Sequence, residues 1–177
     1  MKRLNLLFLI LGVVTIVFFG CKEDECPTPT PTEFTGTSIP ILPGDEGITT
    51  VLPDGRTLID GQTAEWYEEA TDWMVTGQSF WIVNWLIEKE PPFTAQLWGT
   101  AVINVGVKNA GDASRGKWEL SWQGVQTPTQ DGFKIVVDAV GTGTEGEVKG
   151  LFANWTYTMN YNGTPESMFY ATAGTIK

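Results

Sequence analysis

Tryptophan is the residue type with the most chemical potential in this sequence of 177 residues, which contains eight tryptophans and no histidine. An indole ring can stack on a sugar face or line an apolar pocket, and its N–H needs an acceptor when buried. Asparagine and aspartate can bind the hydroxyl groups of the same ligand. The residues that we take as candidates for ligand binding are Trp98, Trp118, Trp122, Trp155, Asn154 and Asp138.

The alternative explanation for the tryptophans is structural. Large aromatic side chains are what a small domain without disulfides buries, and each covers about 150–250 Å². We therefore expect most of the eight tryptophans to lie in the core. We expect two or three to lie at the rim or mouth of a cavity, where the indole N–H finds a polar partner.

Acidic side chains could support glycoside hydrolysis only if two of them faced one bond at a separation of about 5–9.5 Å. Glu65, Glu68, Glu69 and Asp72 cluster in the sequence, and we interpret them as a solvated acidic face. Asp138 is the exception, because it follows three aliphatic residues in "IVVDAV". Burial there would raise its pKa and indicate function, whereas an outward direction would make it an ordinary surface residue.

Several kinds of active site are excluded or unsupported. The lack of histidine excludes Ser-His-Asp and Cys-His arrangements and removes the commonest metal ligand. The two cysteines are too few for a structural zinc site. The segment "GTGTEG" lacks the lysine and the following helix of a phosphate loop. We predict neither a metal nor a cofactor, and we favour a protein that is not an enzyme.

The first 20 residues have the composition of a signal peptide. Lys2 and Arg3 precede an apolar stretch from Leu4 to Phe19, and Cys21 follows directly after Gly20. The apolar stretch is shorter than the roughly 20 residues that a membrane-spanning helix needs. Next come "CKEDE" and then "PTPTPT", which indicates an extended spacer. We predict a signal peptide at 1–20, an acidic and Pro/Thr-rich tether at 21–46, and a single β-barrel domain at 47–177.

This N-terminal arrangement resembles the signal of bacterial lipoproteins, and "CKEDE" resembles the export tag of surface lipoproteins of the Bacteroidota. The resemblance implies fatty-acyl (palmitate-type) attachment at Cys21. It also implies a lipid anchor in the outer membrane, with the body exposed at the cell surface or, alternatively, facing the periplasm. An ordinary secretory signal is the alternative. If Cys21 is acylated, Cys26 has no partner for an intrachain disulfide.

The charge of the chain limits its partners. Removal of residues 1–20 takes away two basic residues and no acidic one, which leaves 9 basic and 21 acidic side chains and a net charge of −12. Phosphate binding needs clustered Lys and Arg, so nucleic acid is excluded as a partner. Contact with a membrane is therefore expected through acyl chains rather than through charge.

The body has the pattern of an all-β domain. In "GKWELSWQG", Trp118, Leu120 and Trp122 alternate with polar residues, which is typical of a strand with one dry face. Strands joined in sequence order by short turns predict an antiparallel meander that closes into an eight-stranded barrel, with a two-sheet β-sandwich as the alternative. Residues 63–74 also show helical spacing, so a helix there stays open. The eight predicted strands lie within 47–53, 55–69, 72–89, 95–108, 116–124, 133–141, 147–161 and 168–177.

The order of the motifs "LPDGRTLIDGQ", "DWMVTGQ", "LWGTAVI", "GKWELSWQG" and "AVGTGTEGEVKGL" resembles bacterial barrels of the allene oxide cyclase and dirigent type. The resemblance covers about residues 52–176 and implies a β-barrel. Plant members of that family perform cyclisation or guide radical coupling, but none of their catalytic residues can be placed in this sequence.

Three functions follow as alternatives. The first is a cell-surface barrel that binds a glycan or a small apolar molecule. The second is an accessory subunit with a filled barrel and a protein partner. The third is a barrel enzyme, such as a cyclase or lyase, that works without histidine. A cavity inside the barrel would separate the first and third alternatives from the second.

Overall fold

The computed structural model describes residues 30–177, except for the side chains of Leu42 and Pro43. Cys21, for which we predict acylation, and the predicted signal peptide lie outside the described residues. The described chain consists of strands and two short 3₁₀ helices. Within residues 30–177, no helix has the length and apolar character needed to cross a membrane.

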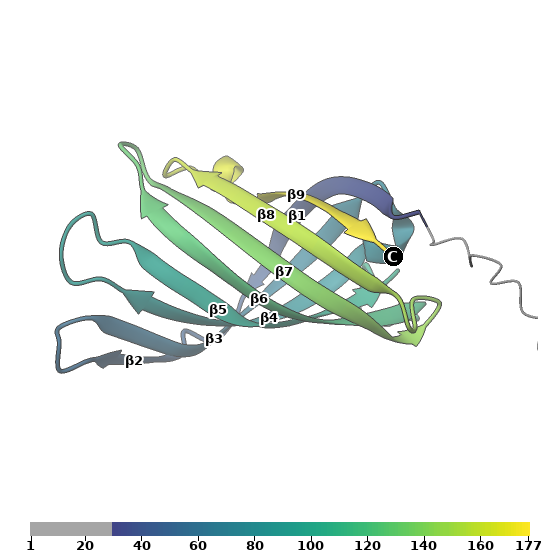
Figure 1. Ribbon diagram of the computed structural model, residues 1–177, viewed down its shortest axis with the longest axis horizontal. Helices are drawn as coiled ribbons and strands as arrows, with labels where there is room; N and C mark the ends of the chain where they lie inside the picture. Colours follow the sequence, from purple (N-terminus) through teal and green to yellow (C-terminus); the bar gives the residue numbers. More distant parts are fainter. Residues whose placement is uncertain (1–29) are drawn as a thin grey trace, which may run out of the picture. The chain divides into compact units, whose positions relative to one another are not determined.

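Nine strands follow one another along the described chain (Figure 1). Their bounds are β1 Thr32–Pro43, β2 Ile48–Val51, β3 Thr57–Ala70, β4 Gly77–Ile87, β5 Ala95–Val105, β6 Gly116–Pro128, β7 Phe133–Gly146, β8 Phe152–Tyr161 and β9 Tyr170–Ile176. The 3₁₀ helix η1, Trp73–Val75, connects β3 to β4, and η2, Pro165–Ser167, lies between β8 and β9.

The strands form a closed antiparallel barrel. From β3 to β9 each strand pairs with the next, and β1 pairs with both β9 and β3, which joins the two edges of the sheet. The prediction of an eight-stranded antiparallel meander barrel is therefore confirmed, and the two-sheet sandwich is excluded. Strand β2 pairs only with β3, so it lies outside the ring as an extension of the β2–β3 hairpin.

The strand that closes the barrel comes from a segment that we assigned to the tether. Residues 31–177 form one compact unit, and β1 occupies Thr32–Pro43, so the body begins before residue 47. The prolines of this segment suggested a spacer, because proline lacks the N–H that a strand interior uses. The register between β1 and β3 shifts between Pro40 and Leu42, and this bulge interrupts the regular pairing at the proline-rich end of the strand.

The open question of a helix at residues 63–74 is resolved in favour of a strand. Strand β3 continues to Ala70, and only the three residues of η1 are helical. Asp72 caps this short helix, since its carboxylate accepts a hydrogen bond from the Met74 N–H at 2.9 Å. The helical spacing of Trp66, Ala70 and Trp73 thus arises across a strand end and a turn.

Large side chains fit inside the barrel because glycines on neighbouring strands leave room for them. Gly99 on β5 pairs with Trp122 on β6, and a Cβ on Gly99 would meet the Trp122 ring and the carbonyl oxygen of Ile82. Gly141 leaves room for the ring of Trp155 in the same way. Alternation along each strand thus determines which side chains point into the barrel, and glycine on a neighbouring strand provides the space that a large ring occupies.

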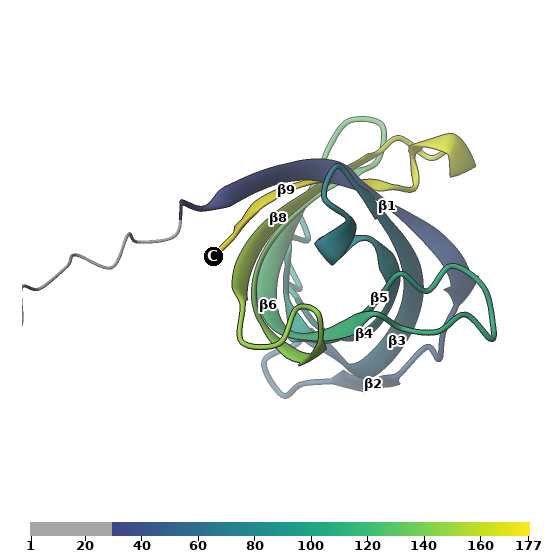
Figure 2. The same ribbon diagram turned by 90° about the vertical axis from the view of Figure 1, so that its right-hand side faces the viewer.

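One end of the barrel is plugged. Helix η1 lies across the opening that is seen in Figure 2, where the β3–β4 connection turns into the barrel. Val75 of η1 is almost completely buried, and the indole N–H of Trp118 donates to the carbonyl oxygen of Met74 at 2.7 Å. Strand β1 starts at this plugged end.

Candidate functional site

A cavity of about 640 Å³ occupies the half of the barrel that the plug does not fill. Its walls are inward-facing side chains of the barrel strands, and Met168, next to η2, lines it as well. The residues of the wall that carry the argument below are six aromatic side chains, Trp66, Trp81, Trp85, Trp122, Tyr157 and Tyr170. The cavity is therefore a mainly apolar chamber inside the ring of strands, with several aromatic rings in its wall.

The aromatic rings form a continuous chain along the wall. Trp81 contacts Trp122 with 5.3 Å between ring centroids, and it meets Tyr157 edge to face at 5.2 Å. Tyr170 extends the chain, since it lies 6.1 Å from Tyr157 and 5.2 Å from Trp66. Edge-to-face contacts of this kind fix the orientation of each ring. The rings of the wall are thus held in place by contacts with one another.

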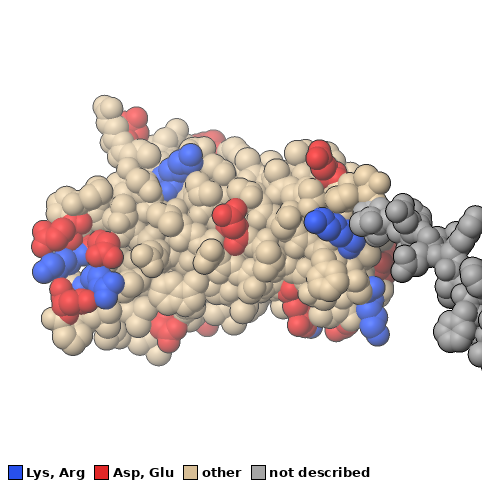
Figure 3. All heavy atoms as spheres, in the orientation of Figure 1, with Lys and Arg blue, Asp and Glu red and all other residues tan. Residues whose placement is uncertain are grey.

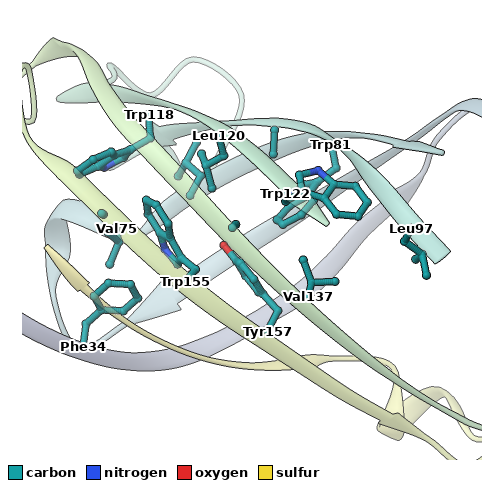
Figure 4. Close-up of a cluster of buried hydrophobic side chains, with 14 of the residues drawn as sticks. Phe34, Val75, Trp81, Leu97, Trp118, Leu120, Trp122, Val137, Trp155 and Tyr157 are labelled. Carbon is teal, nitrogen blue, oxygen red and sulfur yellow. The ribbon is translucent and has the colours of Figure 1, made fainter. Parts of the chain in front are cut away.

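Two polar atoms in this wall have no hydrogen-bond partner. They are the indole nitrogen Nε1 of Trp122, a side chain that is 6% exposed, and the hydroxyl oxygen of Tyr157, which is 1% exposed. Figure 4 shows Tyr157 between Trp155 on one side and the pair of Trp81 and Trp122 on the other. A buried donor without a partner costs about 1–3 kcal/mol, so such groups are rare in protein interiors.

A carboxyl group lies beside the cavity. Glu68 on β3 is 4% exposed and is the only buried acidic residue in the described part of the chain. Its Oε1 atom accepts hydrogen bonds from Ser79 Oγ at 2.7 Å and from Ser38 Oγ at 3.1 Å. The Trp81 indole N–H donates to Ser79 Oγ at 2.9 Å, which connects the carboxyl group to the aromatic wall.

Burial raises the pKa of Glu68 from its ordinary value of 4.5 to about 7, and the hydrogen bonds from Ser79, Ser38 and Trp81 oppose the rise. Burial also raises the pKa values of Tyr157 and Tyr170, and the nearby charge of Glu68 adds to the effect on both. Near neutral pH, Glu68 is thus divided between its two forms while both tyrosines remain protonated.

The arrangement offers hydrogen bonding and one proton-exchanging group, and it offers no metal site. Residues 30–177 contain no cluster of three or more Cys, Asp or Glu side chains that could hold a metal ion. The Trp85 indole N–H donates to Gln62 Oε1 at 2.6 Å, so the hydrogen-bonding need of that indole is already met. Among the side chains that line the cavity, Trp122 and Tyr157 have a buried polar atom without a partner, and neither atom is exposed to the cavity space.

The four tryptophans that we predicted as ligand-binding candidates lie in three different environments. Trp122 lines the cavity, whereas Trp118 and Trp155 pack against each other in the core with ring centroids 5.4 Å apart. Trp98 points outward from β5 and is 39% exposed. Most tryptophans are indeed buried or half-buried, but only one of the four that we named reaches the cavity.

The two polar candidates face outward. Asp138 is exposed and accepts a hydrogen bond from Thr156 Oγ1 at 3.0 Å, so the buried alternative for it is wrong. Asn154 is exposed as well, and its Oδ1 atom accepts from the N–H and the hydroxyl group of Thr175, both at 3.0 Å. Neither side chain lines the interior cavity.

Residues that sequence analysis did not single out carry much of the site. Glu68 belonged to the supposed solvated acidic face, yet it points into the barrel while Glu69 is exposed. The alternation of side chains could have revealed this direction, because residues two apart in a strand, such as Trp66 and Glu68, point to the same face. The prediction of a solvated acidic face rested on composition, which does not say which way a side chain points.

A second hollow lies on the outer face of the barrel. It is shallow and open, and the exposed apolar side chains of Val140 and Phe152 line it together with Asn154. In the space-filling view of Figure 3, charged side chains gather toward the two ends of the barrel and the middle is largely uncharged. This hollow contains no buried unpartnered polar atom among the described residues, unlike the interior cavity.

Comparisons with known proteins give no family for the chain. No protein-family model matches it, and neither the search of curated proteins nor the search of solved structures gives a significant match.

Proposed function

We propose that the barrel binds a small, mainly apolar molecule that carries a hydrogen-bonding oxygen atom. The observation that carries the proposal is the apolar cavity of about 640 Å³, whose lining includes the two side chains with unpartnered polar atoms, Trp122 (Nε1) and Tyr157 (hydroxyl). Both atoms have almost no accessible surface, so a ligand reaches them only if these rings shift slightly. An indole N–H can only donate, so its partner on the ligand has to be an acceptor. A ligand oxygen would remove the cost of leaving these two groups unpaired.

The size and the lining of the cavity support this class of ligand. A volume of about 640 Å³ lies within the range of about 300–1,000 Å³ in which proteins hold small molecules. Aromatic and aliphatic side chains together make up most of the wall, and the tryptophans of the wall point inward. A glycan platform needs aromatic faces on the surface, and of the candidate tryptophans only Trp98 offers one. An apolar ligand is therefore favoured over a glycan.

The two other functional alternatives receive less support. An accessory subunit with a filled barrel would have no use for an empty apolar chamber. A cyclase or lyase would be favoured by two converging groups that both exchange protons near neutral pH. The ionisable groups near Glu68 are Tyr157 and Tyr170, whose pKa values are raised so that they stay protonated, and the lining residues include no lysine or arginine. The proposed function is therefore non-catalytic binding.

For the place of action, we propose a lipoprotein of the outer membrane that is exposed at the cell surface and anchored through Cys21. The sequence supports this with the signal-peptide pattern, the cysteine at its end and the acidic segment that follows. The resemblance to Bacteroidota lipoproteins and to the allene oxide cyclase and dirigent barrels stays a proposal too.

The binding proposal is tested with the chain that lacks residues 1–20 and carries Cys21→Ser. The ligands are a panel of aromatic ethers and ketones and a panel of soluble oligosaccharides, with binding measured by calorimetry. We expect saturable binding of members of the first panel only. Trp122→Phe should weaken that binding about tenfold, since one hydrogen bond to the ligand is lost.

The matched control is Trp98→Phe, which removes an indole N–H from the outer face and should leave affinity unchanged. Binding of oligosaccharides alone, or equal affinity in the Trp122→Phe variant, would contradict the proposal.

The anchor is tested separately. Full-length protein and its Cys21→Ser variant are expressed in a bacterium, and their distribution between membrane and soluble fractions is compared. We expect the variant to leave the membrane fraction, because acyl chains supply the affinity for lipid. A variant that stays with the membrane would contradict acylation at Cys21, and Cys26→Ser is the matched control.

A further inference from the structure

The charge distribution around the cavity restricts the ligand further. Among the described residues that line it, none is lysine or arginine, and the protein has no histidine. The acidic residues Glu46 and Glu65 contribute to the lining, and Glu68 lies behind Ser38 and Trp81, which are both part of the wall. An anionic ligand would therefore find only carboxyl groups and no compensating positive charge.

The same wall is suited to a cation. Trp81, Trp122, Tyr157 and Tyr170 present aromatic rings around the space beside Glu68. A quaternary or protonated amine is attracted to the faces of such rings, and the attraction is larger when the site is desolvated. A carboxylate beside the rings adds a charge of opposite sign at short range.

We infer that the ligand carries, besides its oxygen acceptor, a positively charged amine that is held by the aromatic wall and by Glu68. This inference rests on the proposed binding function and names the chemical class of the ligand, an aromatic or alkyl amine with an ether, ester or hydroxyl oxygen. The oxygen binds Trp122 and Tyr157, and the cationic nitrogen lies among the rings near Glu68.

The inference has a consequence for pH. The groups around Glu68 are Ser38 of β1, Ser79 and Trp81 of β4, Tyr157 of β8 and Tyr170 of β9. The two tyrosines stay neutral up to alkaline pH. Glu68 is thus the group of this set that titrates near neutral pH, with a pKa of about 7. Affinity for a permanently charged ligand should rise as Glu68 loses its proton, and fall about tenfold from about pH 8 to about pH 6.

Three ligands of equal size test the inference. Their binding is measured by calorimetry with the protein that lacks residues 1–20 and carries Cys21→Ser. The cation is choline phenyl ether. The neutral compound is its carbon isostere, in which tert-butyl replaces trimethylammonium, and the anion is phenoxybutanoate. At about pH 8 we expect the cation to bind at least about tenfold more tightly than the neutral ether, and the anion not to bind.

Two variants separate the charge from the shape of the site. Glu68→Gln keeps an acceptor for the two serine hydroxyls, so it should lose most of the preference for the cation and all of the pH dependence. Glu69→Gln changes an exposed neighbour and should behave like the unchanged protein. Circular dichroism and melting show whether each variant is folded.

The outcomes distinguish the two proposals. Equal affinity for the cation and the neutral ether, or an unchanged preference in Glu68→Gln, overturns the inference and leaves the proposed binding function intact. Binding of phenoxybutanoate overturns the inference in the same way. If none of the three ethers binds while other members of the apolar panel do, the inference fails alone. If no member of either panel binds, both proposals fail.

Discussion

The buried carboxyl group of Glu68 determines how the stability of the barrel should change with pH. Burial raises its pKa from 4.5 to about 7 in the folded protein. A carboxyl group with such a raised pKa stabilises the fold fully below its unfolded pKa, and the contribution is lost as the pH rises through the folded pKa. For Glu68 this window lies between 4.5 and about 7.

The size of the effect follows from the shift. One pKa unit corresponds to about 1.4 kcal/mol, so ionisation of Glu68 should lower the free energy of unfolding by about 3 kcal/mol across the window. Glutamine at this position accepts from Ser38 and Ser79 as the protonated acid does, but it never ionises. We expect Glu68→Gln to match the unchanged protein near pH 4.5 and to exceed its stability by about 3 kcal/mol at about pH 8.

Urea unfolding followed by tryptophan fluorescence measures this difference at a series of pH values. Titrations of the other acidic groups are common to both proteins and cancel when the free energies are subtracted. Glu69→Gln serves as the control, because the exposed side chain should give a small difference that does not change with pH. A difference between Glu68→Gln and the unchanged protein that stays constant from acid to alkaline pH would show that the Glu68 carboxylate is not buried in solution.

Further predictions concern packing and the unpartnered groups. Trp118→Ala should lower the free energy of unfolding by about 3–5 kcal/mol, because Trp118 is 0% exposed, whereas Trp98→Ala on the outer face should change the melting temperature little. Gly99→Ala should destabilise the barrel by about 1–3 kcal/mol, since the added methyl group has to displace the Trp122 ring and the strand backbone; unchanged melting would mean that β4 and β5 are less closely spaced. Tyr157→Phe should leave the ligand-free protein as stable or about 1 kcal/mol more stable, because a buried hydroxyl without a partner is removed; a clear loss of stability in urea unfolding would mean that the hydroxyl is hydrogen-bonded.

The fold could be predicted because its determinants are local. Alternation in segments such as "GKWELSWQG" identifies strands, and short turns between consecutive strands define an antiparallel meander. The identity of the closing strand is not local. Whether residues 32–43 or 47–53 complete the ring depends on pairing with both β9 and β3, more than 20 residues away along the chain in each case. Proline in the true closing strand made the wrong segment look the better candidate.

The site could be predicted only in part, for a related reason. Trp118 and Trp122 lie on the same face of β6 and have the same pattern of neighbours in the sequence. One packs against the plug and the other lines the cavity. The difference arises from η1, whose Met74 carbonyl oxygen accepts from Trp118 across 44 residues of sequence. Periodicity therefore identifies inward-facing residues, but it does not say which part of the interior stays empty.

The features that destabilise this barrel are not distributed evenly through its interior. At the plugged end, Val75, Ile103, Val105 and Val148 are almost completely buried around Trp118, whose indole N–H is satisfied. The other half contains the unfilled volume, the two unpartnered polar atoms and, beside it, the acid whose pKa is raised by burial. Each of these features destabilises a protein that has no ligand, and each would be relieved by one that fills the space and hydrogen-bonds to the wall. Local departures from good packing are expected where a fold has been adapted to bind, so their coincidence at the cavity and next to it supports a ligand site there.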